Sequence, residues 1–186
     1  MRCLSTFLAP VLGALFSFSG LAHASSGWHG HLAVEGYGSL LSGAESSPLL
    51  GLNAGWAVRA GASSGRWGAF LHVEQNLWRG TEYGATTVPG ALNVGLGAEL
   101  RFADGRIRSS VTLGPSLLLF DTPLDEAGKV GVFAELRPLG LRWAVSRHLQ
   151  LGLDPLSFAV AAPVLSGIPL VRVQYRTTLS LEVLLP

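Results

Sequence analysis

Few residues in this chain have the type and spacing that chemistry requires, and a histidine beside a glutamate is the clearest case. His72 and Glu74 are two residues apart, so on a β-strand both side chains point to the same face. With a serine from a neighbouring strand, such a pair could act as an acid and a base. His29 and His31 have a spacing that could bind a metal from one strand face, but no third ligand is nearby.

Neither pair makes a strong case for a catalytic or metal site. The chain has no G-x-S-x-G sequence, no zinc signature and no phosphate-binding loop. An acidic segment, residues 121–126, is best interpreted as a solvated loop. We therefore expect His72 and Glu74 to belong to a polar network, and His29 and His31 to lie in a solvated lead-in. We expect no catalytic residue, no cofactor and no metal.

Alternation of apolar and polar residues is the dominant pattern of the chain. In residues 170–184, one parity carries valine, tyrosine, threonine and leucine, and the other carries Arg172, Gln174, Arg176, Ser180 and Glu182. A period of two residues predicts a β-strand with one apolar face. Eight runs with strand character follow one another: residues 31–41, 49–61, 66–78, 91–102, 107–120, 130–145, 148–162 and 170–184. Pro138 interrupts the sixth run and predicts a bulge or bend there.

The N-terminal segment predicts export. Arg2 precedes an apolar stretch, residues 7–18, and Ala22-His23-Ala24 resembles a cleavage site, so residues 1–24 are interpreted as a signal peptide. Residues 25–186 then form a single domain. Without Arg2, that domain has 13 − 1 = 12 basic groups against 12 acidic groups. It is formally neutral and has no cysteine, and no basic patch indicates nucleic acid.

The composition favours a barrel in a membrane. Charged residues are 13% of the chain, about half the roughly 25% of soluble domains. The mean hydropathy is positive, yet after the signal no apolar run approaches the ~20 residues of a spanning helix. A closed barrel satisfies these conditions because its strands satisfy each other's backbone groups. Longer connections also alternate with short ones, as in transmembrane barrels.

Alternation alone would equally suit a soluble calyx of the lipocalin kind, with its apolar face inward. The polar parity favours the opposite orientation, because it combines small residues with paired charges, which suits a crowded lumen. An eight-stranded barrel leaves room for side chains and little else, so we expect a plugged lumen. The predicted lumen ionic network has seven arginines and six acids: Glu35, Arg59, Glu74, Glu99, Arg101, Arg108, Glu135, Arg137, Arg142, Asp154, Arg172, Arg176 and Glu182.

Aromatic residues near the strand ends are consistent with this orientation. Interfacial girdles of a membrane barrel would use aromatic side chains at both levels. The predicted interfacial aromatics are Trp67, Trp78, Phe102, Phe120 and Trp143.

The signal, the eight alternating runs and the alternating connections resemble the small eight-stranded outer-membrane barrels of the OmpA/OmpX kind. The resemblance is architectural and covers nearly the whole mature chain. It implies an all-β fold, an antiparallel up-and-down transmembrane barrel with short periplasmic turns and longer outer loops.

The function that we expect is a non-enzymatic, monomeric outer-membrane protein with a structural or surface-interaction role in the envelope of a Gram-negative-type bacterium. Its expected partners are outer-membrane lipids and the barrel-assembly machinery. Two alternatives remain: an outer-membrane enzyme that modifies lipid, and a soluble periplasmic calyx that binds an apolar ligand.

Overall fold

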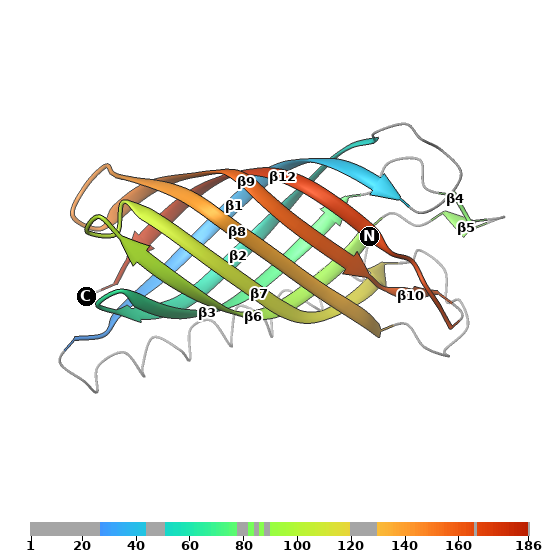
Figure 1. The fold of residues 1–186 in the computed structure, drawn as a ribbon, viewed down its shortest axis with the longest axis horizontal. Helices are drawn as coiled ribbons and strands as arrows, with labels where there is room; N and C mark the ends of the chain where they lie inside the picture. Colours follow the sequence, from blue (N-terminus) through green and yellow to red (C-terminus); the bar gives the residue numbers. More distant parts are fainter. Residues whose placement is uncertain are drawn as a thin grey trace, which may run out of the picture.

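Eight long antiparallel strands close into a barrel (Figure 1). The computed structural model describes residues 27–43, 51–77, 82–83, 86–87, 90–119, 130–165 and 167–185. Each barrel strand pairs with its neighbours along the chain, and the first pairs with the last to close the cylinder. The barrel strands are β1 (His29–Gly43), β2 (Gly51–Ser64), β3 (Trp67–Leu77), β6 (Gly90–Phe102), β7 (Ile107–Leu119), β8 (Val130–Ala144), β9 (Leu149–Ala162) and β12 (Arg172–Leu184). The predicted all-β, eight-stranded, up-and-down architecture is confirmed.

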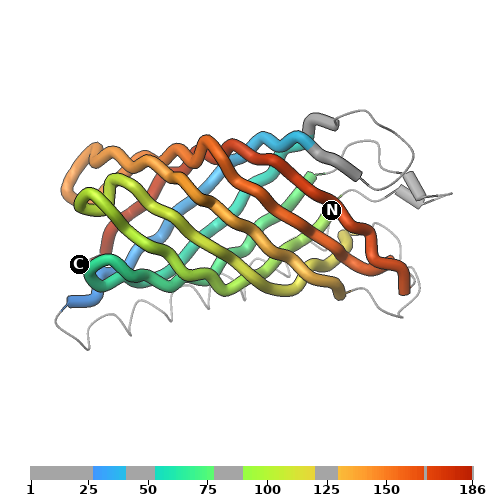
Figure 2. The backbone as a smooth tube through the Cα atoms, viewed as in Figure 1, coloured from blue at the N-terminus to red at the C-terminus, as the bar shows by residue number. Residues whose placement is uncertain are grey.

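The two ends of the barrel differ. One end, at the left of Figures 1 and 2, carries the tight connections, residues 65–66, 103–106 and 145–148, together with the C-terminal end of β12. We call it the short-turn end. The opposite end carries longer connections that contain β4 (Glu82–Tyr83), β5 (Thr86–Thr87), β10 (Val164–Leu165) and β11 (Ile168–Pro169). The predicted signal peptide, residues 1–24, lies outside the described residues.

The turn between β6 and β7 shows why this connection can be so short. Ala103 and Asp104 both have positive φ, 48° and 57°, and the Gly105 amide donates a 3.0 Å hydrogen bond to the Phe102 carbonyl. Two central residues with positive φ define a type I′ turn, whose twist matches that of the paired strands. Gly105 continues with φ 82°, a value that glycine adopts without strain.

Two bulges interrupt the barrel on adjacent strands, and both contain proline. The pairing of β8 shifts between Leu136 and Leu139, which confirms the irregularity predicted at Pro138. The pairing of β9 with β12 shifts between Ser157 and Asp154, on either side of Pro155. Each extra residue reverses the parity of its strand, because side chains alternate with a period of two.

The outward face of the barrel is apolar. In the described parts of the eight strands, every charged residue lies on the inward face, whereas outward residues such as Leu96, Leu113 and Leu179 are 72%, 60% and 64% exposed. The calyx alternative required the apolar parity to face inward, so it is wrong for this barrel. No helix within the described residues is long and apolar enough to span a membrane.

The few polar side chains on the outward face find partners there. The Trp56 indole donates a 3.1 Å hydrogen bond to Oε1 of Gln75. Tyr175 and Thr177 donate hydroxyl hydrogen bonds of 3.2 and 3.3 Å to the carbonyl of Pro155, which the bulge in β9 takes out of register. Trp56, Gln75, Tyr175 and Thr177 are therefore satisfied by local partners on the outward face.

Candidate functional site: the charged lumen

The inward face of the barrel holds nearly all of its charge. Strand alternation directs the thirteen residues of the predicted lumen network inward, and all of them are buried except Arg101 and Arg172, which are partly exposed. Small residues make room for them. A Cβ at Gly97 would lie 2.1 Å from the Phe70 ring, and one at Gly55 would lie 2.2 Å from the Tyr37 hydroxyl. Glycines on the inward parity thus let large side chains fill the lumen.

Arg176 organises the half of the lumen nearer the long connections. Its side chain is 0% exposed, and its two terminal nitrogens donate to Glu74 at 2.7 and 2.9 Å. A further contact of 3.3 Å reaches Glu135 from the opposite wall. The guanidinium also lies over the Tyr37 ring, 4.5 Å from its centroid. A charge this deep is stable only when it is paired and hydrogen-bonded on several sides, and Arg176 meets that condition.

Neutral amides complete the environment of the Glu74 carboxylate. Asn76 and Asn93 donate to Oε1 at 2.9 and 2.6 Å, and Nε2 of His72 lies 3.1 Å from Oε2. Glu74 thus has partners from three strands, β3, β6 and β12. This accumulation of donors offsets much of the cost of burying an ionised carboxylate.

Arg137 links three carboxylates in the middle of the barrel. Its terminal nitrogens lie 2.8 Å from Glu35, 2.9 Å from Glu135 and 2.9 Å from Asp154. Arg142 contacts the same Asp154 at 2.5 Å. Arg137 and Arg142 have opposite parity in the sequence, and both face inward because the Pro138 bulge lies between them.

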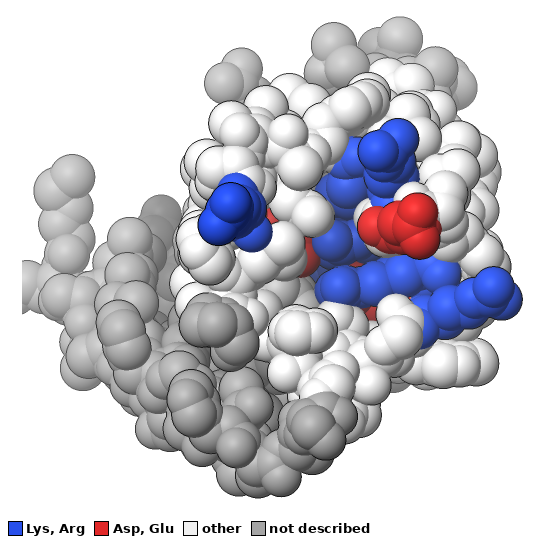
Figure 3. All heavy atoms as spheres, turned by 90° about the vertical axis from the view of Figure 1, so that its left-hand side faces the viewer, with Lys and Arg blue, Asp and Glu red and all other residues white. Residues whose placement is uncertain are grey.

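Arginines outnumber acids at the short-turn end of the lumen. Glu99 is shared by Arg101, which bonds through Nε at 2.6 Å, and by Arg59 and Arg108 at 3.6 and 3.9 Å. Arg108 also holds Glu182 at 2.7 Å. Figure 3 looks onto this end and shows basic side chains gathered at the barrel opening, with a smaller number of acidic groups among them.

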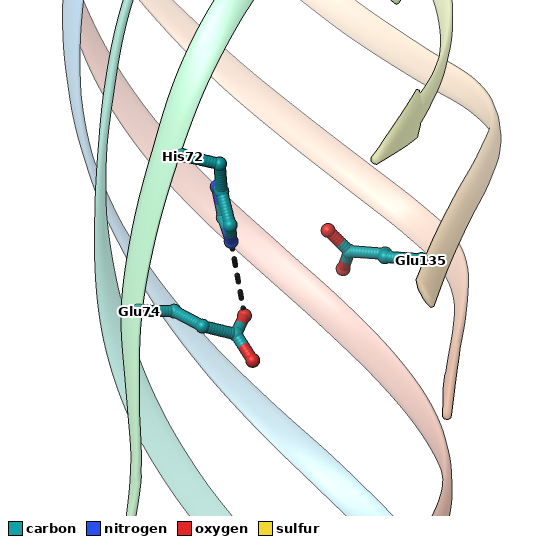
Figure 4. A group of neighbouring side chains, drawn as sticks. All are labelled: His72, Glu74 and Glu135. Carbon is teal, nitrogen blue, oxygen red and sulfur yellow. Dashed lines mark hydrogen bonds and ion pairs between the residues drawn. The ribbon is translucent and has the colours of Figure 1, made fainter. Parts of the chain in front are cut away.

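Three lumenal groups have the composition of a metal site, namely His72, Glu74 and Glu135. One ligand atom from each lies within 4.8 Å of the others. Figure 4 shows that His72 and Glu74 project from one wall toward Glu135 on the other. Arg176 contacts both carboxylates, so a metal ion with these ligands would have to displace a buried guanidinium. His72 stacks on Phe133 with ring centroids 5.9 Å apart and bonds to Glu74, which is a packed arrangement. The group therefore fits a structural ion pair better than a metal centre.

One interpretation of the sequence is wrong. His31 was expected in a solvated lead-in, but it is buried in β1, 4% exposed, and its Nδ1 lies 3.3 Å from Nη2 of Arg101. His29 is exposed, as expected. His31 occupies an inward position because it shares the parity of Ala33 and Glu35, which are also buried.

The predicted aromatics occupy exposed outward positions at one end. Trp67, Phe102 and Trp143 are 65%, 45% and 51% exposed and lie at the short-turn ends of β3, β6 and β8. Trp78 and Phe120 lie outside the described residues.

The predicted network named only charged residues, although neutral polar side chains belong to it as well. Asn76, Asn93 and Ser157 donate hydrogen bonds to lumenal carboxylates, and Gln150 and Gln174 accept them from arginines. Tyr37 donates to Asn76 and lies under the Arg176 guanidinium. Each of these neutral residues lies on the inward parity, so strand alternation was the signal that could have identified them.

The fold is similar to those of two small bacterial outer-membrane barrels. Neisserial surface protein A (NspA) matches with a TM-score of 0.60 and 12% identity, over 84% of this chain and 96% of that one. Ail, the attachment invasion locus protein of Yersinia pestis, matches with a TM-score of 0.52 and 12% identity, over 86% and 99%. Ail in complex with the heparin analogue sucrose octasulfate matches similarly, at 0.53 and 13% over the same shares. No protein-family model and no curated protein sequence matches the chain. These likenesses confirm the architectural resemblance to small eight-stranded outer-membrane barrels.

Proposed function

We propose that the chain is a β-barrel of a bacterial outer membrane, with eight strands that span the lipid bilayer. One observation carries the proposal: in the described strands the outward face bears no charged side chain, while the inward face bears all of them. A soluble barrel would place charge on its outer surface. Barrel strands of 11 to 15 residues also reach the ~9–11 residues that a tilted spanning strand needs.

The role that we propose is non-enzymatic, in envelope structure or surface interaction. The lumen supports it, because its ionisable groups are tied to one another and leave His72 and Glu74 buried and engaged. The predicted lumen ionic network then acts as a plug that holds the eight strands together. Surface interaction would use the long connections, which include residues 44–50, 78–89 and 120–129.

The sequence of the long connections limits the partner they would bind. They contain five acids and two basic residues: Glu45, Glu82, Asp121, Asp125, Glu126, Arg79 and Lys129. A polyanion such as the sucrose octasulfate bound by Ail would be repelled by this balance. We therefore propose that any surface partner of this end is neutral or basic.

The same proposal implies how the chain is exported and inserted into the membrane. Residues 1–24 would serve as a signal peptide for export, and residues 25–186 would form the barrel. The barrel-assembly machinery would insert the chain, which would then function as a monomer among outer-membrane lipids, with the short-turn end toward the periplasm. Trp67, Phe102 and Trp143 would lie at the interface on that side.

Fractionation of cells that express the full chain tests this proposal. We expect recovery in the outer membrane, extraction only by detergent, and faster gel migration of the unheated protein than of the boiled protein. Recovery as a soluble periplasmic protein would contradict the proposal. The enzymatic alternative predicts that the protein alters envelope lipids and that His72→Ala abolishes the change, whereas we expect identical lipid profiles with and without the protein.

A further inference from the structure

A recess of about 460 Å³ opens at the short-turn end of the barrel, between the β6–β7 turn and the last residues of β8. Its polar side is formed by Arg106, Arg142 and Gln150, and its apolar side by Ile107, Leu141 and Trp143. The volume lies in the range of small-molecule sites, roughly 300–1,000 Å³. The recess therefore has one basic wall and one apolar wall.

The basic wall can accept an anion without breaking the lumen network. Arg106 is exposed, and the described part of the chain gives its guanidinium no ion-pair partner. Arg142 is buried and holds Asp154 through its terminal nitrogens, with its Nε 3.8 Å from Glu182, so it adds positive charge to this wall while staying in the lumen network. Asp104, at the lip, is the one acidic residue in the lining and opposes this positive charge.

The apolar wall belongs to the outward face of the barrel. Ile107 and Trp143 are 37% and 51% exposed and lie at the ends of β7 and β8, where the apolar surface meets the turns. A ligand held here would have its charged group beside Arg106 and its apolar part along the outer surface. An amphipathic anion has this shape, and the bilayer itself supplies such a molecule.

We infer that the recess binds the phosphate-bearing headgroup of an anionic phospholipid in the leaflet that meets the short-turn end. The phosphate lies against Arg106, and the glycerol backbone and first acyl carbons lie over Ile107, Leu141 and Trp143. Choline headgroups bind less well, because their cationic end must approach a wall rich in arginine. The inference rests on the proposed function, since only a membrane-inserted barrel meets this lipid.

Native mass spectrometry of the folded barrel in detergent tests the inference. The protein is titrated with phosphatidylglycerol, with phosphatidylcholine and with inorganic phosphate in separate arms. We expect retained phosphatidylglycerol and little retained phosphatidylcholine. Arg106→Gln weakens phosphatidylglycerol binding about fivefold, the effect of roughly one arginine near a membrane surface. Asp104→Asn strengthens it, and asparagine tolerates the positive φ at this position.

Arg66→Gln is the matched control, because Arg66 is an exposed arginine of the β2–β3 turn outside the recess. Its phosphatidylglycerol affinity stays within twofold of the unmodified chain. An equal loss in Arg66→Gln and Arg106→Gln would overturn the inference, since it would show only a general surface charge effect. Equal retention of phosphatidylcholine, or full competition by inorganic phosphate, would also overturn it. A chain that fails to fold in detergent, or that fractionates as soluble, contradicts the proposed function instead.

Discussion

The inward and outward faces of this barrel satisfy their polar side chains in different ways. On the inward face, polar groups are many and charged groups share partners across the lumen, as Arg176 does with Glu74 and Glu135. On the outward face, polar groups are few and their hydrogen bonds are to local neighbours, as that of Trp56 is to Gln75. Both faces belong to the same eight hydrogen-bonded strands.

The difference shows how strongly the surroundings of a polar group determine the free-energy cost of leaving it without a partner. A buried charge in the lumen would lose several kcal/mol if left unpaired, so neighbouring strands share its partners. An outward hydroxyl or amide needs only one partner, and a bulge carbonyl or an adjacent side chain supplies it. The four changes below test this contrast, in order of decreasing expected effect.

Arg176→Leu should destabilise the barrel by about 3–5 kcal/mol, because it leaves the buried Glu74 and Glu135 without their shared cation. Urea unfolding of the refolded protein in micelles measures this loss. The double change Arg176→Leu with Glu74→Leu should recover part of it. A strictly additive double mutant would contradict the coupling between these two strands.

Leu96→Arg should cost roughly 2–4 kcal/mol, the price of a charge at the bilayer midplane. Leu96 lies in the middle of β6 and is 72% exposed on the outward face. Unfolding in lipid vesicles measures the change, with Leu96→Ala as the control for lost side-chain volume. A near-neutral result for Leu96→Arg would break the assignment of this face to lipid.

Arg101→Leu should cost about 1–2 kcal/mol, less than Arg176→Leu, because Arg101 is partly exposed and Glu99 keeps Arg59 and Arg108 nearby. Glu99→Leu should cost more, since three arginines then lose a shared partner. The same unfolding assay ranks the two variants. The reverse order would mean that Glu99 is not the centre of the charge pairs at the short-turn end.

Tyr175→Phe should have the smallest effect, about 0.5–1.5 kcal/mol, because Thr177 still donates to the Pro155 carbonyl. Adding Thr177→Val should cost more than the sum of the two single changes, since the carbonyl then has neither hydroxyl. Purely additive losses in vesicle unfolding would show that the two hydroxyls do not substitute for each other.

Alternation predicted the strands and their inward residues because a period of two is a local property. The run predicted at residues 91–102 corresponds to β6, Gly90–Phe102. Pro138 predicted its bulge for an equally local reason, the missing amide donor. Local sequence patterns were therefore sufficient to predict the positions of the strands and which residues of the candidate site point inward.

The pairing inside the lumen could not be predicted in this way. Arg176 meets Glu74 across a sequence separation of 102 residues, and that meeting depends on the tilt and stagger of the closed barrel. The burial of His31 was missed because it was assigned to a solvated lead-in, although it shares the inward parity of Glu35 in the predicted run 31–41. Cross-lumen partners are a property of the whole cylinder and have no signature in one strand.

The seam between β1 and β12 has a consequence for the order of folding. In the closed barrel, only β1 and β2 lie between β12 and β3. Before β1 pairs with β12, strands β3 and β12 lie far apart in the open sheet, because β6, β7, β8 and β9 separate them. Arg176 and Glu74 can therefore pair only at closure, the most non-local and slowest kind of step. In the proposed membrane barrel, the charged face would have to stay in water until then, because an open sheet in hydrocarbon would expose unpaired arginines and carboxylates. The proposed function therefore requires closure and entry into the bilayer to proceed together.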